Sequence, residues 1–190
     1  MFSLKENLKF ININQNYLKY LHESCPEVYY KQSGYESKPY LGILVNTENY
    51  EYVVPLSSAK EKHKTWKNVD QDRFVIYENC PIAKVSEKDI FVQISENEAK
   101  HILSVIDLKK MIPVKKGVYD FVNINPDKND SLDTKKYKIL LNLEYTFCLK
   151  IIGQIITKIS RLYEKQAKTG KIIKFCCDFK LLEQKCDEWK

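Results

Sequence analysis

The stretch that decides the fold runs Lys38-Pro-Tyr-Leu-Gly-Ile-Leu-Val-Asn46 and, after a short turn, Tyr50-Glu-Tyr-Val-Val-Pro-Leu-Ser-Ser-Ala-Lys60. Its two apolar runs predict a β-hairpin with strands at about Tyr40–Asn46 and Glu51–Leu56. The first strand is nearly all apolar and is expected inside a sheet. The second alternates between apolar and polar residues, so we expect it to have a solvent-exposed face.

The predicted hairpin ends in hydroxyl and amine groups. Ser57 and Ser58 follow the second strand directly, Lys60 comes two residues later, and Lys38 precedes the first strand. Such groups can orient a ribose 2′-hydroxyl for attack on the neighbouring phosphate and neutralise the charge that develops there. A polar strand exit without any catalytic role has the same composition, and residue spacing alone does not separate the two interpretations.

The hairpin continues into a cationic stretch, Lys60–Lys67, which we call the lysine segment. Its lysines can bind phosphates while an aromatic ring stacks on an unpaired base. A histidine can also carry protons near neutral pH. The alternatives are a solvated lysine loop and an incidental histidine. The candidates for RNA contact in this segment are Lys62, His63, Lys64, Trp66 and Lys67.

Composition bounds the class of protein. A length of 190 residues predicts a single domain over residues 1–190. The net charge is +6, and all but two of the 31 basic residues are lysines, which is a modest argument for a nucleic-acid partner. The apolar run Ile151–Ile159 is interrupted by polar residues, so no membrane span is predicted. The first residues lack an apolar signal core, and a cytoplasmic location is expected.

Residue patterns also argue against metals and cofactors. The six cysteines form no CxxC pair, so we expect reduced, structural thiols and no zinc. The three histidines lie far apart in the sequence, and the carboxylates form no dense cluster. None of the five glycines belongs to a phosphate-binding loop. The sequence therefore predicts no metal and no cofactor.

The rest of the chain predicts an α+β fold. A first helix is expected after a cap at Asn14, and Pro113 confines a later strand to an edge or a bulge. Apolar residues at three- and four-residue steps predict one long helix over Leu132–Thr169, and Asp178 is expected to cap a final helix. Further strands are predicted at Arg73–Tyr77, Ile90–Ile94 and His101–Val105.

Several motifs in succession resemble the type III toxin–antitoxin endoribonuclease family, which includes the ToxN, AbiQ and CptN proteins. Each motif is short, but together they span nearly the whole chain in the family's order. The matching stretches are Asn16–Leu21, Lys38–Ile43, Pro55–Lys60 with His63, Asp107–Pro113 and Cys177–Lys185.

The resemblance implies a strongly bent antiparallel β core wrapped by helices, similar to the MazF and Kid toxins. It also implies a metal-independent, sequence-preferring endoribonuclease that leaves 2′,3′-cyclic phosphate and 5′-hydroxyl ends. Its implied partners are cellular or phage RNA and a small, repeated, pseudoknotted antitoxin RNA, which it cuts from a precursor and with which it assembles into closed rings. The implied biological role is phage abortive infection or plasmid maintenance.

The same resemblance assigns roles to residues. The family's active-site pattern carries over to Lys38, Ser57, Ser58 and Lys60, and its upstream tyrosine matches Tyr35 with a spacing that differs by one residue. We hypothesise that Ser57 orients the attacking hydroxyl or the phosphate, and that Lys60 and Lys38 stabilise the phosphorane. Further lysines would line the RNA groove, namely Lys62, Lys64 and Lys171.

Two other classes of function are compatible with the sequence. A non-catalytic RNA-binding protein would need only the lysines and tyrosines. A protein–protein interaction module would need neither, and salt-sensitive binding of RNA would count against it.

Overall fold

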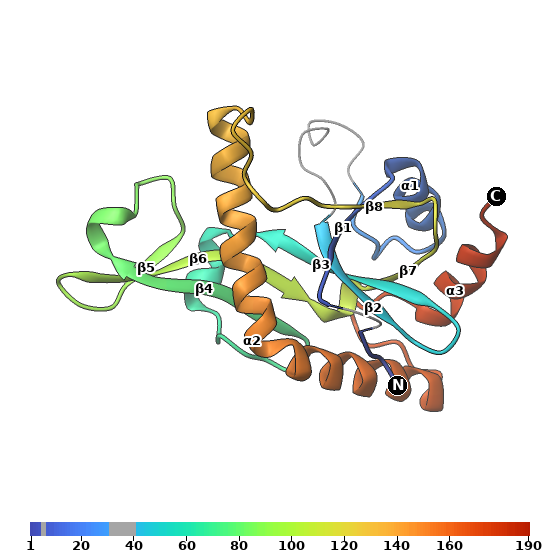
Figure 1. The fold of residues 1–190 in the computed structure, drawn as a ribbon. Coiled ribbons are helices and arrows are strands. Elements are labelled where there is room, and N and C mark those ends of the chain that lie inside the picture. The colour runs from blue at the N-terminus through green and yellow to red at the C-terminus, as the bar shows by residue number, and fades with distance from the viewer. Residues whose placement is uncertain (5–6, 31–40) are drawn as a thin grey trace. The chain divides into compact units, whose positions relative to one another are not determined.

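The computed structural model describes residues 1–4, 7–30 and 41–190 (Figure 1). The described chain forms two compact units. The first comprises Met1–Leu56, Asp107–Val122 and Gly153–Lys190, and the second comprises Ser57–Ile106 and Asn123–Ile152. The chain therefore passes from one unit to the other inside two strands and one long helix. Antiparallel strands and helices make up both units, which confirms the α+β class.

Antiparallel strands form the sheet of the first unit. Strand β3 (Glu51–Ser58) pairs with β2 (Leu41–Asn46) and also with β7 (Ile112–Val114). On the far side of β2 follow β1 (Phe10–Ile13) and β8 (Tyr119–Phe121). Strands β1 and β8 are not predicted from the sequence, because four and three residues are too few to show a clear period.

The predicted hairpin is confirmed, and its register is regular from Gly42 opposite Pro55 to Asn46 opposite Glu51. Strand β2 lies inside the sheet, with Ile43 fully buried, as its apolar sequence predicts. Strand β3 continues two residues past the predicted end. The two serines that follow Leu56 in the sequence therefore belong to the strand.

The predicted solvent-exposed face of the second strand is wrong. Tyr52, Val53 and Val54 are all fully buried, although their side chains alternate between the two faces of the sheet. The ring of Tyr52 is covered edge-on by Phe2 and Phe179. Aromatic residues distant in the sequence thus bury the face of β3 that its alternating pattern predicts to be exposed to solvent.

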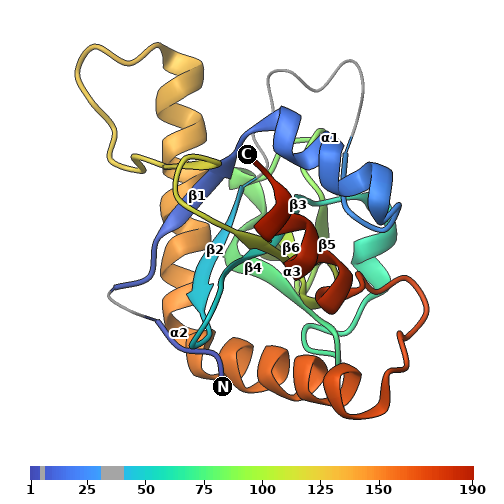
Figure 2. The same ribbon diagram turned by 90° about the vertical axis from the view of Figure 1, so that its right-hand side faces the viewer.

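Two short helices complete this part of the fold. Helix α1 (Gln15–Ser24) begins after Asn14, whose side chain accepts a hydrogen bond from Asn16 N at 2.8 Å. Helix α3 (Phe179–Glu188) begins after Asp178, whose carboxylate accepts from Leu181 N at 3.0 Å. Both predicted caps are confirmed. The two helices lie side by side in Figures 1 and 2.

Pro113 lies in an edge strand, β7, as predicted, and it is opposite Tyr52 of β3. Proline has no N–H to donate, so it suits the open side of an edge strand. The Tyr17 hydroxyl donates to the Pro113 carbonyl at 2.9 Å, so that oxygen is occupied as well. Neither backbone group of Pro113 is left for pairing.

The second unit is built on β4 (Arg73–Pro81), β5 (Phe91–Gln93) and β6 (Glu98–Asp107), which pair antiparallel with β6 between the other two. The three strands confirm the predicted ones, and β4 and β6 run longer than predicted. The buried centre of this unit includes Val75, Ile102 and Val105.

Helix α2 (Leu132–Thr169) has the predicted bounds. It stops at Gly170, which adopts a left-handed φ of 63°. The predicted apolar stripe is wrong at Leu143, which is 37% exposed, while Glu144 is buried and points inward. Burial raises the pKa of Glu144 to about 7, so this carboxyl is available in its neutral form near physiological pH.

By length and composition alone α2 could cross a membrane, since an 18-residue window has a mean hydropathy of 1.5. Core helices of soluble proteins meet the same criterion, so this is weak evidence. About a fifth of that window is buried, 22%.

Two glycines give a matched stability test. A Cβ at Gly42 would lie 2.4 Å from a methyl of Val53 and 2.6 Å from the carbonyl oxygen of Val54. We therefore expect Gly42→Ala to lower the free energy of unfolding by about 1–3 kcal/mol. A Cβ at Gly153 meets nothing within 4 Å, so Gly153→Ala should stabilise by up to about 1 kcal/mol. Urea unfolding of both variants checks this, and equal effects would contradict it.

Candidate functional site

The two serines of the predicted hydroxyl pair lie at the end of β3 and differ in their exposure to solvent. Ser57 is half-buried, and its hydroxyl lies 3.5 Å from the carbonyl oxygen of Val105 on β6, a long and weak hydrogen bond. Ser58 is exposed, and so is Lys60. The Ser57 hydroxyl is thus held loosely and remains able to turn toward a ligand.

The lysine segment is folded, and it is not a free loop. Residues Glu61–Thr65 form a 3₁₀ helix. The backbone N–H of Lys60 donates to Nδ1 of His63 at 3.0 Å, and the backbone N–H of His63 donates to the Lys60 carbonyl at 2.8 Å. This reciprocal pair fixes the backbone at Lys60 directly after the two serines.

His63 is buried, with 3% of its surface exposed. Because Nδ1 accepts a hydrogen bond, the neutral ring carries its proton on Nε2. Burial, with the nearby charges of Lys62, Lys60 and Arg73, lowers the pKa of His63 to about 4. The ring is therefore neutral at physiological pH. This geometry supports a positioning role, and base stacking by His63 stays a prediction that would require the ring to leave its site.

Trp66 anchors the other end of the segment. Its ring centroid lies 4.5 Å from that of His63, and it packs against the apolar centre of the second unit. The Arg73 guanidinium lies 4.0 Å from the centroid, and the Lys62 amine lies 5.3 Å from it. Trp66 is thus partly enclosed by cations, a geometry in which cation–π attraction adds to packing.

The remaining lysines differ in what they contact. Lys64 forms an ion pair with Glu61 at 2.9 Å, whereas Lys67 is exposed. Lys171 is also exposed and belongs to the first unit, where it follows α2. Lys38 and Tyr35 lie outside the described residues, so their predicted catalytic roles stay predictions.

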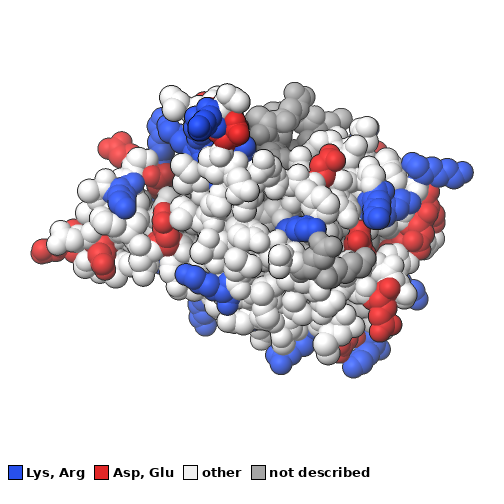
Figure 3. All heavy atoms as spheres, viewed as in Figure 1, with Lys and Arg blue, Asp and Glu red and all other residues white. Residues whose placement is uncertain are grey.

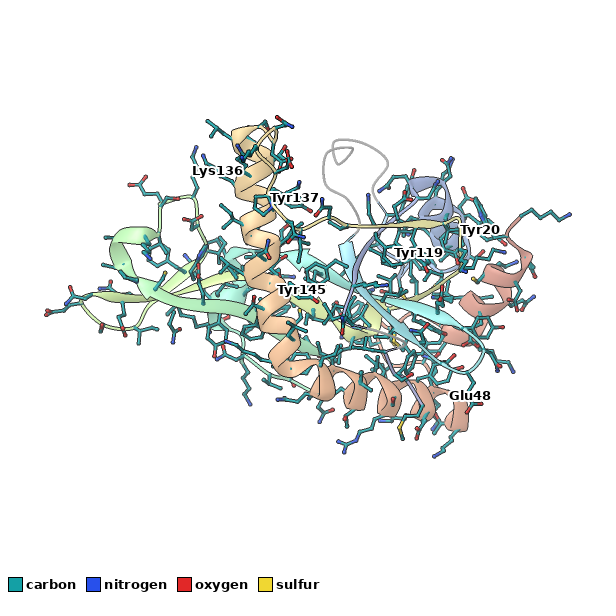
Figure 4. The ribbon with its side chains drawn as sticks, in the orientation of Figure 1. Tyr20, Glu48, Tyr119, Lys136, Tyr137 and Tyr145 are labelled. Atoms are coloured by element: carbon teal, nitrogen blue, oxygen red, sulfur yellow. The ribbon has the colours of Figure 1, made fainter. Side chains whose placement is uncertain are left out.

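Sequence reasoning missed two features. Arg73, on β4, stacks on the ring of Trp66. In the sequence, only the three-residue spacing of Lys60, His63 and Trp66 could have indicated that this segment is ordered. A second basic group lies over the first turns of α2, as Figure 3 shows. Lys136 and the 40%-exposed Tyr137 project from these turns in different directions (Figure 4), so an exposed cation and an exposed aromatic ring follow each other in the sequence there.

The second unit therefore offers hydroxyls, the exposed side chain of Lys60 on a backbone fixed by a neutral histidine, and an ordered row of lysines. Such a set can bind a phosphodiester and orient it without a metal. None of the described residues from Ser57 to Lys67 belongs to a cluster of metal-ligating side chains. The fold and this arrangement define a class: an α+β protein with a basic strand end that carries two adjacent hydroxyls.

The family comparison is specific. The family described as "Toxin ToxN, type III toxin-antitoxin system" matches residues 9–187. This chain belongs to that family, as its motifs predict.

Curated relatives share about a quarter of their residues with this chain. The endoribonuclease ToxN of Bacillus thuringiensis subsp. kurstaki is 26% identical, over 98% of this chain and 86% of its own length. The endoribonuclease AbiQ of Lactococcus lactis subsp. lactis is 27% identical, over 96% and 89%. A ToxN from Pectobacterium atrosepticum is 25% identical, over 94% and 91%.

Solved structures agree in fold. One, from work on selective toxin inhibition by a non-coding RNA pseudoknot, has a TM-score of 0.70 at 23% identity, over 96% of this chain and 98% of its own. A structure of AbiQ, described as a lactococcal anti-phage endoribonuclease, has a TM-score of 0.64 at 22% identity, with 96% and 98% covered. The likeness to MazF and Kid stays a prediction.

The neutral His63 predicts a pH dependence. Its pKa of about 4 in the folded protein lies below the ordinary 6.5, so the unfolded state binds more protons between these values. The stability contributed by this residue is present above pH 6.5 and is lost as pH falls toward 4. Urea unfolding across this range should show a smaller loss in His63→Gln than in wild type. Identical pH profiles would refute the assignment.

Proposed function

We propose that this chain is a metal-independent endoribonuclease toxin of a type III toxin–antitoxin system. Membership in the ToxN family and relatives named endoribonucleases support the activity. The single observation that carries the proposal is the placement of Lys60. Its backbone is fixed by a buried, neutral His63, directly beyond the hydroxyls of Ser57 and Ser58.

The reaction would be attack of a ribose 2′-hydroxyl on the adjacent phosphorus, with loss of the 5′-oxygen of the next nucleotide. This gives a 2′,3′-cyclic phosphate and a 5′-hydroxyl end. Ser57 would orient the 2′-hydroxyl or the phosphate, and Lys60 would stabilise the phosphorane charge, together with Lys38. Ser58 and Tyr35 would support substrate geometry.

The neutral histidine matters for this chemistry. A protonated His63 could not accept the Lys60 N–H through Nδ1, because both ring nitrogens would then be donors. Its low pKa keeps the acceptor available at physiological pH. The backbone that carries the Lys60 amine is thus positioned by a group that has no charge of its own.

The proposed partners are RNAs. The relatives include a toxin inhibited by a non-coding RNA pseudoknot and an antiviral system regulated by a processed non-coding RNA. For this chain we propose a repeated, pseudoknotted antitoxin RNA that it processes, cellular or phage RNA as substrate, and a closed protein–RNA ring. We further propose that residues 1–190 act as one domain in the cytoplasm.

Removal of the site residues tests the activity. Ser57→Ala and Lys60→Ala should each lower RNA cleavage by about 10²–10³-fold, because each removes one preorganised group. Cleavage is followed by end mapping of RNA incubated with purified protein in EDTA. Lys88→Ala, at an exposed lysine of the same unit, is the matched control and should cleave at the wild-type rate.

Wild-type cleavage by both site variants at equal protein levels would show that the site lies elsewhere. The alternative function, a non-catalytic RNA-binding protein, predicts intact RNA and a shifted gel band with every variant, wild type included. Expression in bacteria without antitoxin RNA gives a second readout. The two site variants should then lose their growth inhibition, whereas Lys88→Ala should keep it.

Salt dependence tests the lysine segment. Each phosphate contact to single-stranded RNA contributes about 0.7 to the slope of log binding constant against log salt concentration. Lys62→Ala and Lys67→Ala should each reduce that slope by about this amount when measured in the Ser57→Ala background, which prevents cleavage. The slope for Lys88→Ala should equal that of the parent. Unchanged slopes in both segment variants would place RNA on another surface.

A further inference from the structure

We propose that Glu78, Cys80 and His101 form a binding site for a thiophilic divalent cation of the zinc class. One potential ligand atom from each residue lies within 4.8 Å of the others. The donors are a carboxylate oxygen, a thiol sulfur and an imidazole nitrogen, the set that zinc takes in proteins. All three residues belong to the second unit.

Strand geometry brings these residues together. Glu78 and Cys80 are two residues apart on β4, so their side chains leave the same face of the sheet. His101 comes from β6, the neighbouring strand. The residue pattern does not reveal this site, because His101 lies more than twenty residues beyond Cys80 and only strand pairing brings the two together.

The distances suit a tetrahedral ion. Nδ1 of His101 lies 3.1 Å from the Glu78 carboxylate. Zinc–nitrogen and zinc–oxygen bonds of about 2.0–2.1 Å at a tetrahedral angle separate the two ligand atoms by about 3.3 Å. An ion could therefore take the place of the proton between these two atoms with little movement of either side chain. The Cys80 sulfur lies within 4.8 Å of both atoms, close enough to complete the set of ligands with a small shift.

The other ring nitrogen of His101 lies near a carboxylate. Nε2 is 3.9 Å from the Asp89 carboxylate, so a small approach of the two side chains would complete a hydrogen bond. Asp89 is itself held by the backbone N–H and the hydroxyl of Ser86, at 2.8 and 2.9 Å. A carboxylate that accepts from the non-ligating nitrogen fixes the ring and its tautomer. Asp89 would therefore orient His101 without binding the ion.

The environment favours a cation. Cys80 is 9% exposed, and the carboxylates of Glu78 and Asp89 both face the His101 ring. Two carboxylates and a thiol thus share a small volume with one imidazole. A divalent ion would bridge these donor atoms on release of the thiol proton. His101 and Glu78 are half-buried, so the site is open to solvent on one side.

The position along β6 indicates a structural role. Val105, whose carbonyl oxygen faces the Ser57 hydroxyl, lies four residues beyond His101, or about 13 Å along a strand at ~3.3 Å per residue. The ion would join β4 to β6 and would not touch the phosphate. This inference is independent of the proposed cleavage, which is expected to survive EDTA.

Cobalt(II) titration of the metal-stripped, reduced protein tests the site. Binding should saturate at one equivalent with a thiolate-to-cobalt absorption band in the near ultraviolet, and zinc should abolish the band by displacing cobalt. Cys80→Ser should lose the band. Cys148→Ala removes a buried cysteine of the same unit and should keep it.

A second pair of variants distinguishes the ligand, His101, from the residue that would orient it, Asp89. His101→Gln should abolish saturable binding, whereas Asp89→Asn should weaken it by about 10–100-fold and leave the band in place. Zinc should also raise the Tm of wild type but not of Cys80→Ser. The proposal is overturned if no thiolate band appears, or if Cys80→Ser and His101→Gln bind cobalt as wild type does.

Discussion

The register of β2 against β3 is the constraint on which the rest of the structure depends. Gly42 faces Pro55 so closely that a single methyl group would collide with Val53. A slip by one residue would turn every side chain of β3 to the opposite face, and Ser57 and Ser58 would exchange places. The register at Gly42 therefore decides which hydroxyl meets the β6 backbone, although Gly42 lies 15 residues before Ser57 in the chain.

At the end of β3, the groups that supply positive charge differ from the group that positions the backbone of Lys60. Lysines supply the charge, but the group that positions Lys60 is an uncharged imidazole enclosed by three cations. Those same cations help to keep the imidazole neutral, because each disfavours its protonation. The positive charge of these residues thus also preserves the hydrogen bond that orders the segment. The strand end is ordered with the help of the same cations that make it basic.

Local patterns in the sequence predicted much of the fold and part of the site. The long helix, both short helices with their caps, and the hairpin follow from periodicity and cap residues that act within a few positions. The burial of Tyr52 and the inward position of Glu144 could not be predicted, because each depends on contacts with residues distant in sequence. The candidate serines and Lys60 lie where predicted, whereas His63 proved to be buried. A contact between its ring and the Lys60 backbone has no signature in composition.

The edge strand β7 is closed by its own backbone chemistry and by its cover. At Pro113 the nitrogen carries no hydrogen, and the carbonyl oxygen is already taken by the Tyr17 hydroxyl. All three residues of β7 are buried, and helix α3 packs against the strand, so the sheet ends here beneath a helix. Any other residue at position 113 would bring a backbone N–H into this covered edge, where it would need a partner away from water.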